Sequence, residues 1–314
     1  MTQTKWPWTQ DTAYVFPGQG AQWVGMGRCL HEAFPSARDT FREADDTLGM
    51  SLSRLCFEGP DEELSQTVNA QPAILTVSVA CLRAVCEATG GLTTPVFMAG
   101  HSLGEYTALV ASDVVDFADA VRLTRERGRL MHEAGQQIPG GMAAIIGLDE
   151  ISMEEICQET GVQVANLNSP GQIVFSGTRE ALVRAVDLAT AMGARHTIPL
   201  RVSGAFHSSL MEPAREAMAQ VISDIEFRNP SVPIVVNCTA EPMTAAGAIK
   251  EELVDQISSC VQWQKSVEYM VANGVSTFIE VGPGAVLSGL IKRIDRKARI
   301  LNVGDTGSIT AVRS

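Results

Sequence analysis

A G-x-S-x-G element places one serine where it could act as a nucleophile. Ser102 lies at the centre of this element, which occupies residues 100–104. The preceding residues 96–99 are predicted to form a buried strand, and residues 105–111 are predicted to begin a helix. A sharp strand-to-helix turn exposes the serine hydroxyl, and the first N–H groups of the helix point toward an oxyanion formed there. Taken alone, the motif is equally explained as a glycine-rich turn, because the chain contains 27 glycines.

A serine hydroxyl needs a base to become a nucleophile at neutral pH. His207 is the best candidate, because its segment, residues 203–211, is predicted to lie where a small domain returns to a large one. Taken alone, His207 could also be a surface-loop histidine. His101 is adjacent to Ser102, and neighbouring side chains in a tight turn usually diverge. We therefore interpret His101 as supporting structure.

The segments that must position these residues alternate between strand-like and helix-like patterns. Strands are predicted at residues 14–16, 96–99, 234–236 and 277–281, and helices at residues 24–41, 72–89, 249–259 and 266–273. This alternation predicts an α/β fold with a parallel sheet and helices on both of its faces.

The middle of the chain follows a different order of elements. Its pattern is β-α-β-β-α-β, with segments at residues 142–147, 152–160, 162–166, 172–176, 179–192 and 196–200. That order is typical of a ferredoxin-like unit. We therefore predict a small domain at residues 138–203, inserted into a large domain formed by residues 1–137 and 204–314. A cleft between the two domains is the expected substrate site.

Composition excludes several classes of function. A net charge of −12 argues against nucleic-acid binding, which needs a basic surface. Residues 1–10 lack the apolar core of a signal peptide, and no continuous apolar run is long enough to span a bilayer. We therefore expect a cytoplasmic protein with no membrane partner.

Cofactor and metal motifs are also missing from the sequence. The seven cysteines contain no C-x-x-C pair and the five histidines no H-x-x-x-H spacing, so no metal site is predicted. The glycine loops at residues 18–20 and 282–284 lack the third glycine of a dinucleotide fingerprint. Leu290 stands where a phosphate-binding loop requires lysine.

Seven motifs in order along the chain closely resemble those of the malonyl-CoA:acyl-carrier-protein transacylases. They are FPGQGAQ (16–22), GHSLGEY (100–106), RG (127–128), NSPGQIV (168–174), GAFHS (204–208), VQW-KSVEYM (261–270) and EVGPG (280–284). The resemblance runs from about residue 12 to about residue 304. It implies an α/β-hydrolase-like large domain with a ferredoxin-like insertion, which agrees with the periodicity.

The resemblance implies a two-step transfer through Ser102. Ser102 would attack the thioester of malonyl-CoA while His207 takes its proton, and the phosphopantetheine thiol of acyl carrier protein would then open the malonyl-serine ester. No bound cofactor is implied. Backbone N–H groups of Leu103 and Gln19 would hold the oxyanion. A main-chain carbonyl, that of Gln256, would orient the histidine in place of an acidic residue.

Three further residues carry substrate selection in this reading. Arg127 matches the family residue that binds the malonyl carboxylate, which a planar guanidinium can grip through two hydrogen bonds. Phe206 resembles the bulky residue of malonyl-specific relatives and would disfavour an α-methyl branch. Asn168 is predicted to line the cleft, although the Asn-Ser-Pro-Gly sequence is equally good turn chemistry.

An acidic carrier protein needs a local basic surface on this acidic chain. Lys292 and Arg293 belong to a basic cluster near the C-terminus, and we predict that they help to dock the carrier. The alternative is a solvated helix face.

The leading hypothesis is an S-malonyltransferase of fatty-acid synthesis. A free-standing acyltransferase of a polyketide synthase would use the same chemistry on different carriers. A serine esterase would leave Arg127 and the family motifs without a role. A non-catalytic carrier-binding protein would not need Ser102, His207 and Arg127 together.

Overall fold

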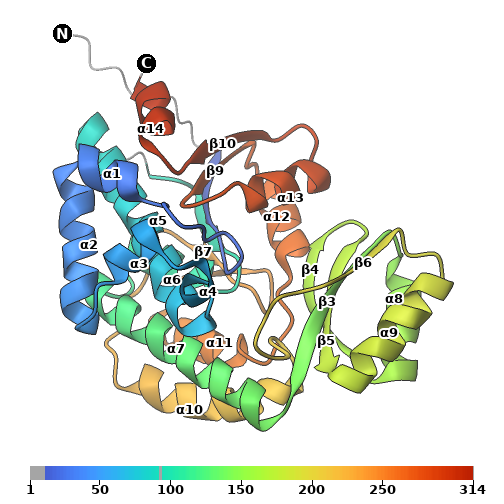
Figure 1. Ribbon diagram of the computed structural model, residues 1–314. Helices are drawn as coiled ribbons and strands as arrows, with labels where there is room; N and C mark the ends of the chain where they lie inside the picture. The colour runs from blue at the N-terminus through green and yellow to red at the C-terminus, as the bar shows by residue number, and fades with distance from the viewer. Residues whose placement is uncertain (1–10, 92–93, 314) are drawn as a thin grey trace.

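The computed structural model describes residues 11–91 and 94–313, and its larger part is built on a six-stranded sheet (Figure 1). The strand order is β10-β9-β1-β2-β7-β8, and every neighbouring pair is parallel except β7 and β8. The strands are β1 (Thr12–Phe16), β2 (Phe97–Gly100), β7 (Ile234–Val235), β8 (Pro242–Met243), β9 (Thr277–Val281) and β10 (Arg299–Val303). The N-terminal segment that was expected to lack a signal peptide, residues 1–10, lies outside the described residues.

Helices cover both faces of this sheet, because the central strands are apolar on both sides. On β1, Tyr14 and Phe16 enter one core and Ala13 and Val15 enter the other, as the two-residue period of a strand requires. The helices are α1 (Arg28–Ala33), α2 (Pro35–Leu48), α3 (Leu52–Glu58), α4 (Asp61–Leu64), α5 (Thr67–Thr89), α6 (Gly104–Ala111), α7 (Phe117–Gln137), α10 (Glu212–Ser223), α11 (Ala246–Asp255), α12 (Trp263–Ala272), α13 (Val286–Ile294) and α14 (Thr306–Arg313), with a 3₁₀ turn η1 (Ser209–Met211). Helices α12 and α13 pack on one face, and α5, α6 and α7 pack on the other.

The middle of the chain forms a separate four-stranded antiparallel sheet in the order β4-β5-β3-β6. Its elements are β3 (Gly140–Ile146), α8 (Glu150–Thr160), β4 (Gln163–Ser169), β5 (Gln172–Thr178), α9 (Arg179–Ala191) and β6 (His196–Pro199). This order is ferredoxin-like, and the two helices pack on the sheet around a core of their own. The fold is therefore α/β, with an α/β-hydrolase-like larger part and a ferredoxin-like smaller one. The domain limits at residues 138 and 203 stay a prediction.

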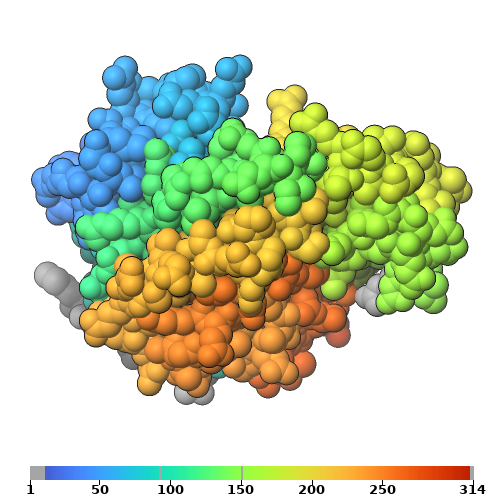
Figure 2. All heavy atoms as spheres, turned by 90° about the horizontal axis from the view of Figure 1, so that it is seen from below, coloured from blue at the N-terminus to red at the C-terminus, as the bar shows by residue number. Residues whose placement is uncertain are grey.

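The smaller sheet forms a lobe at one side of the molecule, yellow-green in both views (Figures 1 and 2). Seen from below, α10 lies across the larger part beside α7 (Figure 2). Strand β4 is tied to the larger part by Val261, whose backbone exchanges hydrogen bonds of 2.9 Å with Ala165 and Leu167. These bonds fix the lobe beside the larger sheet.

Two predicted elements differ from the structure. The single helix expected at residues 24–41 is two helices, because Phe34 is extended before Pro35, as residues preceding proline tend to be. Helix α5 begins five residues before the predicted start at Pro72, so the proline lies inside the helix. Pro72 has no N–H for the Val68 carbonyl four residues earlier, and that carbonyl accepts from the Arg125 side chain at 3.1 Å instead.

By length and composition, α5 could cross a membrane, in contrast to the expectation from the apolar runs. In this fold it is a core helix, with 67% of its most apolar window buried inside the protein. We therefore interpret its apolar character as packing.

Candidate active site

Ser102 lies in a sharp turn between β2 and α6, at the carboxyl edge of the parallel strands. Its φ is +52°, a left-handed conformation that non-glycine residues rarely adopt and that is concentrated at functional sites. Gly100 and Gly104 make the turn possible. A Cβ at Gly100 would lie 1.9 Å from the carbonyl carbon of Gly104, and one at Gly104 would lie 2.1 Å from the oxygen of Phe16.

Side chains from two other elements hold the backbone of this turn. The Ser102 N–H donates to Asn237 Oδ1 at 2.7 Å, and Asn237 Nδ2 donates to the carbonyl of Gly100 at 2.7 Å. Gln256 Nε2, at the end of α11, donates to the carbonyl of Ser102 at 3.1 Å. The strained conformation of the serine is thus fixed on both sides.

His207 is in position to act as the base for Ser102. Its Nε2 lies 2.8 Å from Ser102 Oγ, and its Nδ1 lies 2.8 Å from the main-chain oxygen of Gln256. A carbonyl only accepts, so Nδ1 carries the proton and Nε2 is free to accept the serine proton. Burial, followed by the positive charge of Arg127, lowers the pKa of His207 to about 3. The imidazole is therefore neutral at neutral pH.

Arg127 reaches the same point from α7 and is almost fully buried. One terminal nitrogen donates to Ser102 Oγ at 3.0 Å and to Gln256 Oε1 at 2.8 Å, and the other donates to Gln71 Oε1 at 2.8 Å. Its guanidinium also lies 5.4 Å from the ring centre of Tyr106. Burial lowers the pKa of Arg127, but an arginine side chain keeps its charge in proteins. A buried cation beside the nucleophile can bind an anionic acyl group.

Two backbone N–H groups near Ser102 have no acceptor among the described residues and can bind an oxyanion. Leu103 immediately precedes the first residue of α6, and Gln19 lies in the loop after β1. The loops touch, because the His101 N–H donates to the carbonyl of Phe16 at 3.1 Å. Within residues 11–91 and 94–313, neither the Leu103 N–H nor the Gln19 N–H has an acceptor. The Gln19 side chain is held by Thr67 Oγ1 at 3.2 Å.

The smaller sheet contributes Asn168 to the neighbourhood of the nucleophile. Asn168 Oδ1 on β4 lies 2.8 Å from His101 Nε2, and the His101 ring lies 5.8 Å from that of Trp263. His101 therefore binds Asn168 of the lobe and joins the lobe to the nucleophile turn. Phe206 is 95% buried in the main core, directly before His207.

Lys292 and Arg293 lie exposed at the end of α13 and also make contacts within the protein. Lys292 Nζ donates to the carbonyls of Arg296 at 2.6 Å and Ala298 at 3.2 Å. Arg293 donates to the side chain of Gln172 on β5. Arg293 therefore lies at the junction of the two sheets, whereas the Lys292 ammonium is bound within the larger part.

Three polar residues around this cluster were not predicted from the sequence. Asn237 follows β7, Glu105 is the second residue of α6, and Glu252 lies on α11. Glu105 lies inside the GHSLGEY motif, and Asn237 follows a predicted strand whose carboxyl end is at the same edge of the sheet. Nothing in the sequence around Glu252 distinguishes it from an exposed helix residue.

The geometry supports nucleophilic acyl chemistry. Ser102 has a neutral base, and the base has an orienting carbonyl. Two nearby N–H groups have no acceptor in the described part of the chain, and a buried cation lies beside the hydroxyl. This arrangement contains the parts that an acyl-transfer site needs.

Comparison with known proteins places the chain in a family. The acyl transferase domain family matches residues 13–303. The malonyl CoA-acyl carrier protein transacylase of Bacillus subtilis is 48% identical over 95% of this chain and 94% of its own length. The Escherichia coli transacylase is 49% identical over 90% of this chain and 92% of its own length.

Solved structures agree with the sequence matches. An acyl carrier protein S-malonyltransferase from Vibrio cholerae superposes with a TM-score of 0.92 at 42% identity, covering 96% of this chain and 99% of that one. A malonyl-transacylase solved in complex with the holo acyl-carrier protein of a type II polyketide synthase superposes with a TM-score of 0.93 at 44% identity. The match covers 96% of this chain and 98% of that one. The chain therefore belongs to the malonyl CoA-acyl carrier protein transacylases, a family of acyltransferases.

Proposed function

We propose that this enzyme transfers the malonyl group of malonyl-CoA to the phosphopantetheine thiol of acyl carrier protein, for fatty-acid synthesis in the cytoplasm. The observation that carries the proposal is the contact of Ser102 Oγ with both His207 Nε2 and Arg127. A nucleophile with a neutral base can form an acyl ester, and the buried cation selects an acyl group that carries a carboxylate. No metal or bound cofactor takes part in this scheme.

The first half-reaction loads the serine. Ser102 Oγ bonds to the thioester carbon as its proton moves to His207 Nε2. The tetrahedral intermediate collapses by breaking the carbon–sulfur bond, and the imidazolium returns its proton to the departing CoA sulfur. The imidazolium is held by the Gln256 carbonyl during this step. The product is a malonyl-serine ester.

The second half-reaction reverses these roles with a new thiol. His207 takes the proton of the phosphopantetheine thiol, and its sulfur attacks the ester carbonyl. The carbon–oxygen bond to Ser102 then breaks, and the serine oxygen recovers the proton. The enzyme ends in its starting state, so the two substrates react in a ping-pong order.

Two backbone donors are proposed to stabilise both tetrahedral intermediates. The N–H groups of Leu103 and Gln19 are unpaired within the described ranges. Preorganised donors of this kind typically contribute about 3–4 kcal/mol each to transition-state stabilisation. Because both are main-chain groups, no side-chain substitution deletes them.

Substrate choice is assigned to Arg127, Phe206 and Asn168. Arg127 would bind the malonyl carboxylate, and neutral acyl groups would leave a buried cation unpaired. Phe206 would narrow the site against an α-methyl branch, worth about 1–3 kcal/mol. Asn168 would line the cleft from the smaller lobe, where it contacts His101.

The carrier is proposed to dock at the junction of the larger part and the lobe. Arg293, which contacts Gln172 of the lobe, and its neighbour Lys292 would offer positive charge to an acidic carrier. A carrier of a polyketide synthase is a second candidate acceptor, because a relative at 44% identity has been solved with such a carrier.

The function is tested by incubating the enzyme with labelled malonyl-CoA and holo acyl carrier proteins of both kinds. We expect label on a carrier and none on apo carrier, which lacks the thiol. No label on any carrier would contradict the proposal. Rapid hydrolysis of neutral p-nitrophenyl esters without a thiol acceptor would indicate an esterase instead.

A further inference from the structure

Two glutamates that the reaction scheme does not use are buried against each other beneath the nucleophile turn. Glu105 on α6 has no exposed surface, and Glu252 on α11 is 4% exposed. The N–H groups of Asn237 and Cys238, which are adjacent in the chain, each donate to one of these carboxyl groups at 3.1 Å, so the two carboxyl groups lie side by side. Two buried carboxylates held on neighbouring N–H groups would repel each other strongly, so the arrangement needs a physical explanation.

Each carboxyl group has one oxygen that is satisfied and one that is not. Glu105 Oε2 accepts from the Asn237 N–H and from Gln256 Nε2, both at 3.1 Å. Glu252 Oε1 accepts from the Cys238 N–H at 3.1 Å. Glu105 Oε1 and Glu252 Oε2 have no donor among the described residues.

One proton between the two groups satisfies both free oxygens. If Glu105 Oε1 carries it, that O–H donates to Glu252 Oε2, and every other contact of the pair is kept. The pair then carries one negative charge instead of two. Burial, and after it the charge of Glu252, raise the pKa of Glu105 well above its ordinary value, which is consistent with this placement.

The residues held by Glu105 are those that hold the reacting groups. Asn237 fixes the backbone N–H of Ser102. Gln256 contacts the Ser102 carbonyl and Arg127 through its side chain, and His207 through its main-chain oxygen. A shift of the Glu105 carboxyl would therefore move nucleophile, base and carboxylate-binding cation together.

We propose that Glu105 and Glu252 are positioning residues that share one proton, and that the pair fixes Asn237 and Gln256 so that Ser102, His207 and Arg127 keep their geometry. The single negative charge that remains balances the buried charge of Arg127 at a distance. Neither glutamate touches substrate. This inference rests on the proposed malonyl transfer.

The experiment is a double-mutant cycle with Glu105→Gln and Glu252→Gln, read as kcat/KM for serine acylation. In Glu105→Gln, the amide oxygen accepts from Asn237 and Gln256 and the amide nitrogen donates to Glu252. In Glu252→Gln, the amide oxygen accepts from Cys238 and the amide nitrogen donates to an ionised Glu105. Each single variant keeps all hydrogen bonds and one negative charge, so we expect it to lose less than about tenfold.

The double variant cannot satisfy the same set of contacts. With glutamine at both positions, the two amide NH₂ groups face each other and neither has an acceptor. The pair also supplies no negative charge near Arg127. We expect its loss to exceed the product of the single losses by at least about tenfold. Glu105→Ala removes the acceptor for both partners, and we expect a fall of about 10²-fold that Glu105→Gln restores.

A matched control is the exposed pair Glu126 and Glu133, which flanks Arg129 on α7. The variants Glu126→Gln and Glu133→Gln should combine additively. The proposal is overturned if the Glu105 and Glu252 substitutions are also additive, or if Glu105→Gln is as slow as Glu105→Ala. Unmodified enzyme is assayed alongside with malonyl-CoA, so failure of the proposed function appears as no acylation before any substitution.

Discussion

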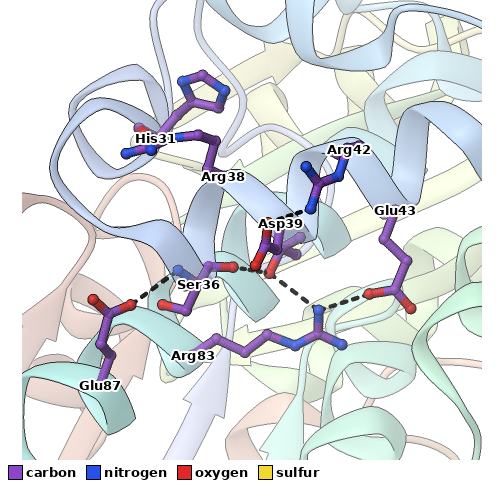
Figure 3. A network of polar contacts seen from close by, with 9 residues as sticks. His31, Ser36, Arg38, Asp39, Arg42, Glu43, Arg83 and Glu87 are labelled. Carbon is purple, nitrogen blue, oxygen red and sulfur yellow. Dashed lines mark hydrogen bonds and ion pairs between the residues drawn. The ribbon is translucent and has the colours of Figure 1, made fainter.

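Two polar networks in this protein contrast in what surrounds them. The first is the buried cluster in which Ser102, His207 and Arg127 meet. The second joins α2 to α5 at the surface, where Arg83 contacts Glu43 at 2.8 Å and the Ser36 N–H donates to Glu87 Oε2 at 2.9 Å (Figure 3). The side chains of Arg83 and Glu43 are 37% and 41% exposed, whereas Arg127 is 1% exposed.

The two networks differ in whether water can take the place of a lost hydrogen-bond partner. An exposed ion pair exchanges readily with water and contributes at most about 1 kcal/mol. A buried polar group that loses its hydrogen-bond partner cannot bond to water instead, so the protein loses the full desolvation free energy of that group. The two networks have similar residue types, so burial and not composition separates a helix contact from a site that can do chemistry.

The largest effect on activity is expected from removing the nucleophile of the buried cluster. Ser102→Ala should lower malonyl transfer by at least about 10⁴-fold, because no other group can carry the acyl ester. Transfer is measured by following label from malonyl-CoA to holo carrier. Unfolding temperature close to that of the unmodified protein is the control for folding. Substantial transfer by this variant would place the nucleophile elsewhere.

The next largest effect is expected at the buried cation. Arg127→Ala should reduce acylation by malonyl-CoA by about 10²-fold or more, because the carboxylate loses a charge-assisted pair, and acetyl-CoA should become the better substrate in relative terms. Arg127→Lys should recover little, since lysine lacks the planar fork. The ratio of kcat/KM values for the two thioesters measures this. An unchanged malonyl preference would refute the role of Arg127.

The burial of His207 gives a prediction for pH. A base with a lowered pKa stays neutral as the pH falls, so serine acylation should persist below 6.5 and decline only as the pH approaches about 3. Single-turnover acylation rates measured as the pH is lowered, with circular dichroism to identify where the protein unfolds, provide the test. An acid limb with its midpoint at 6.5 or above, while the protein is still folded, would show a histidine unaffected by its surroundings.

Elements formed by adjacent residues could be predicted from the sequence, whereas contacts between distant segments could not. The strand, the turn at Ser102 and the following helix could be predicted because glycine spacing and apolar runs report on adjacent residues. Phe34 and Pro35 split one predicted helix into two, which a proline before a helical pattern could have indicated.

The hydrogen-bond partners of Ser102 show which contacts the sequence does not predict. Its hydrogen bonds reach Asn237 and Gln256, 135 and 154 positions away along the chain. No pattern in one sequence pairs such residues, and Glu252 looks like any polar residue of an amphipathic helix until its burial is known. The resemblance to a family supplied roles for Arg127 and Gln256, and these roles stay predictions until the variants are measured.

A smaller effect is expected at the edge of the lobe. Arg293→Glu should raise the KM for carrier by about threefold at low salt and have less effect at high salt, because an exposed charge steers association and is screened. Arg42→Glu at the exposed Arg42–Asp39 pair on α2 is the control, since it makes the same charge change at another surface. Equal effects of the two substitutions, or none, would exclude Arg293 from the docking surface.

The smallest effect is expected in the network of Figure 3. Glu43→Gln should change the free energy of unfolding by about 1 kcal/mol or less and leave malonyl transfer intact, because Arg83 remains partly in water. Urea unfolding and the transfer assay measure the two quantities. A loss of several kcal/mol would mean that exposure does not separate the two networks.

We propose that Ser102 carries the malonyl group and that its buried neighbours select that group. Intact-protein mass after brief exposure to malonyl-CoA, without carrier, tests it most directly. We predict a gain of one malonyl group that is lost when holo carrier is added, no gain in Ser102→Ala, and little gain from acetyl-CoA or methylmalonyl-CoA. A malonyl adduct that survives in Ser102→Ala, or equal loading by acetyl-CoA, would contradict the account.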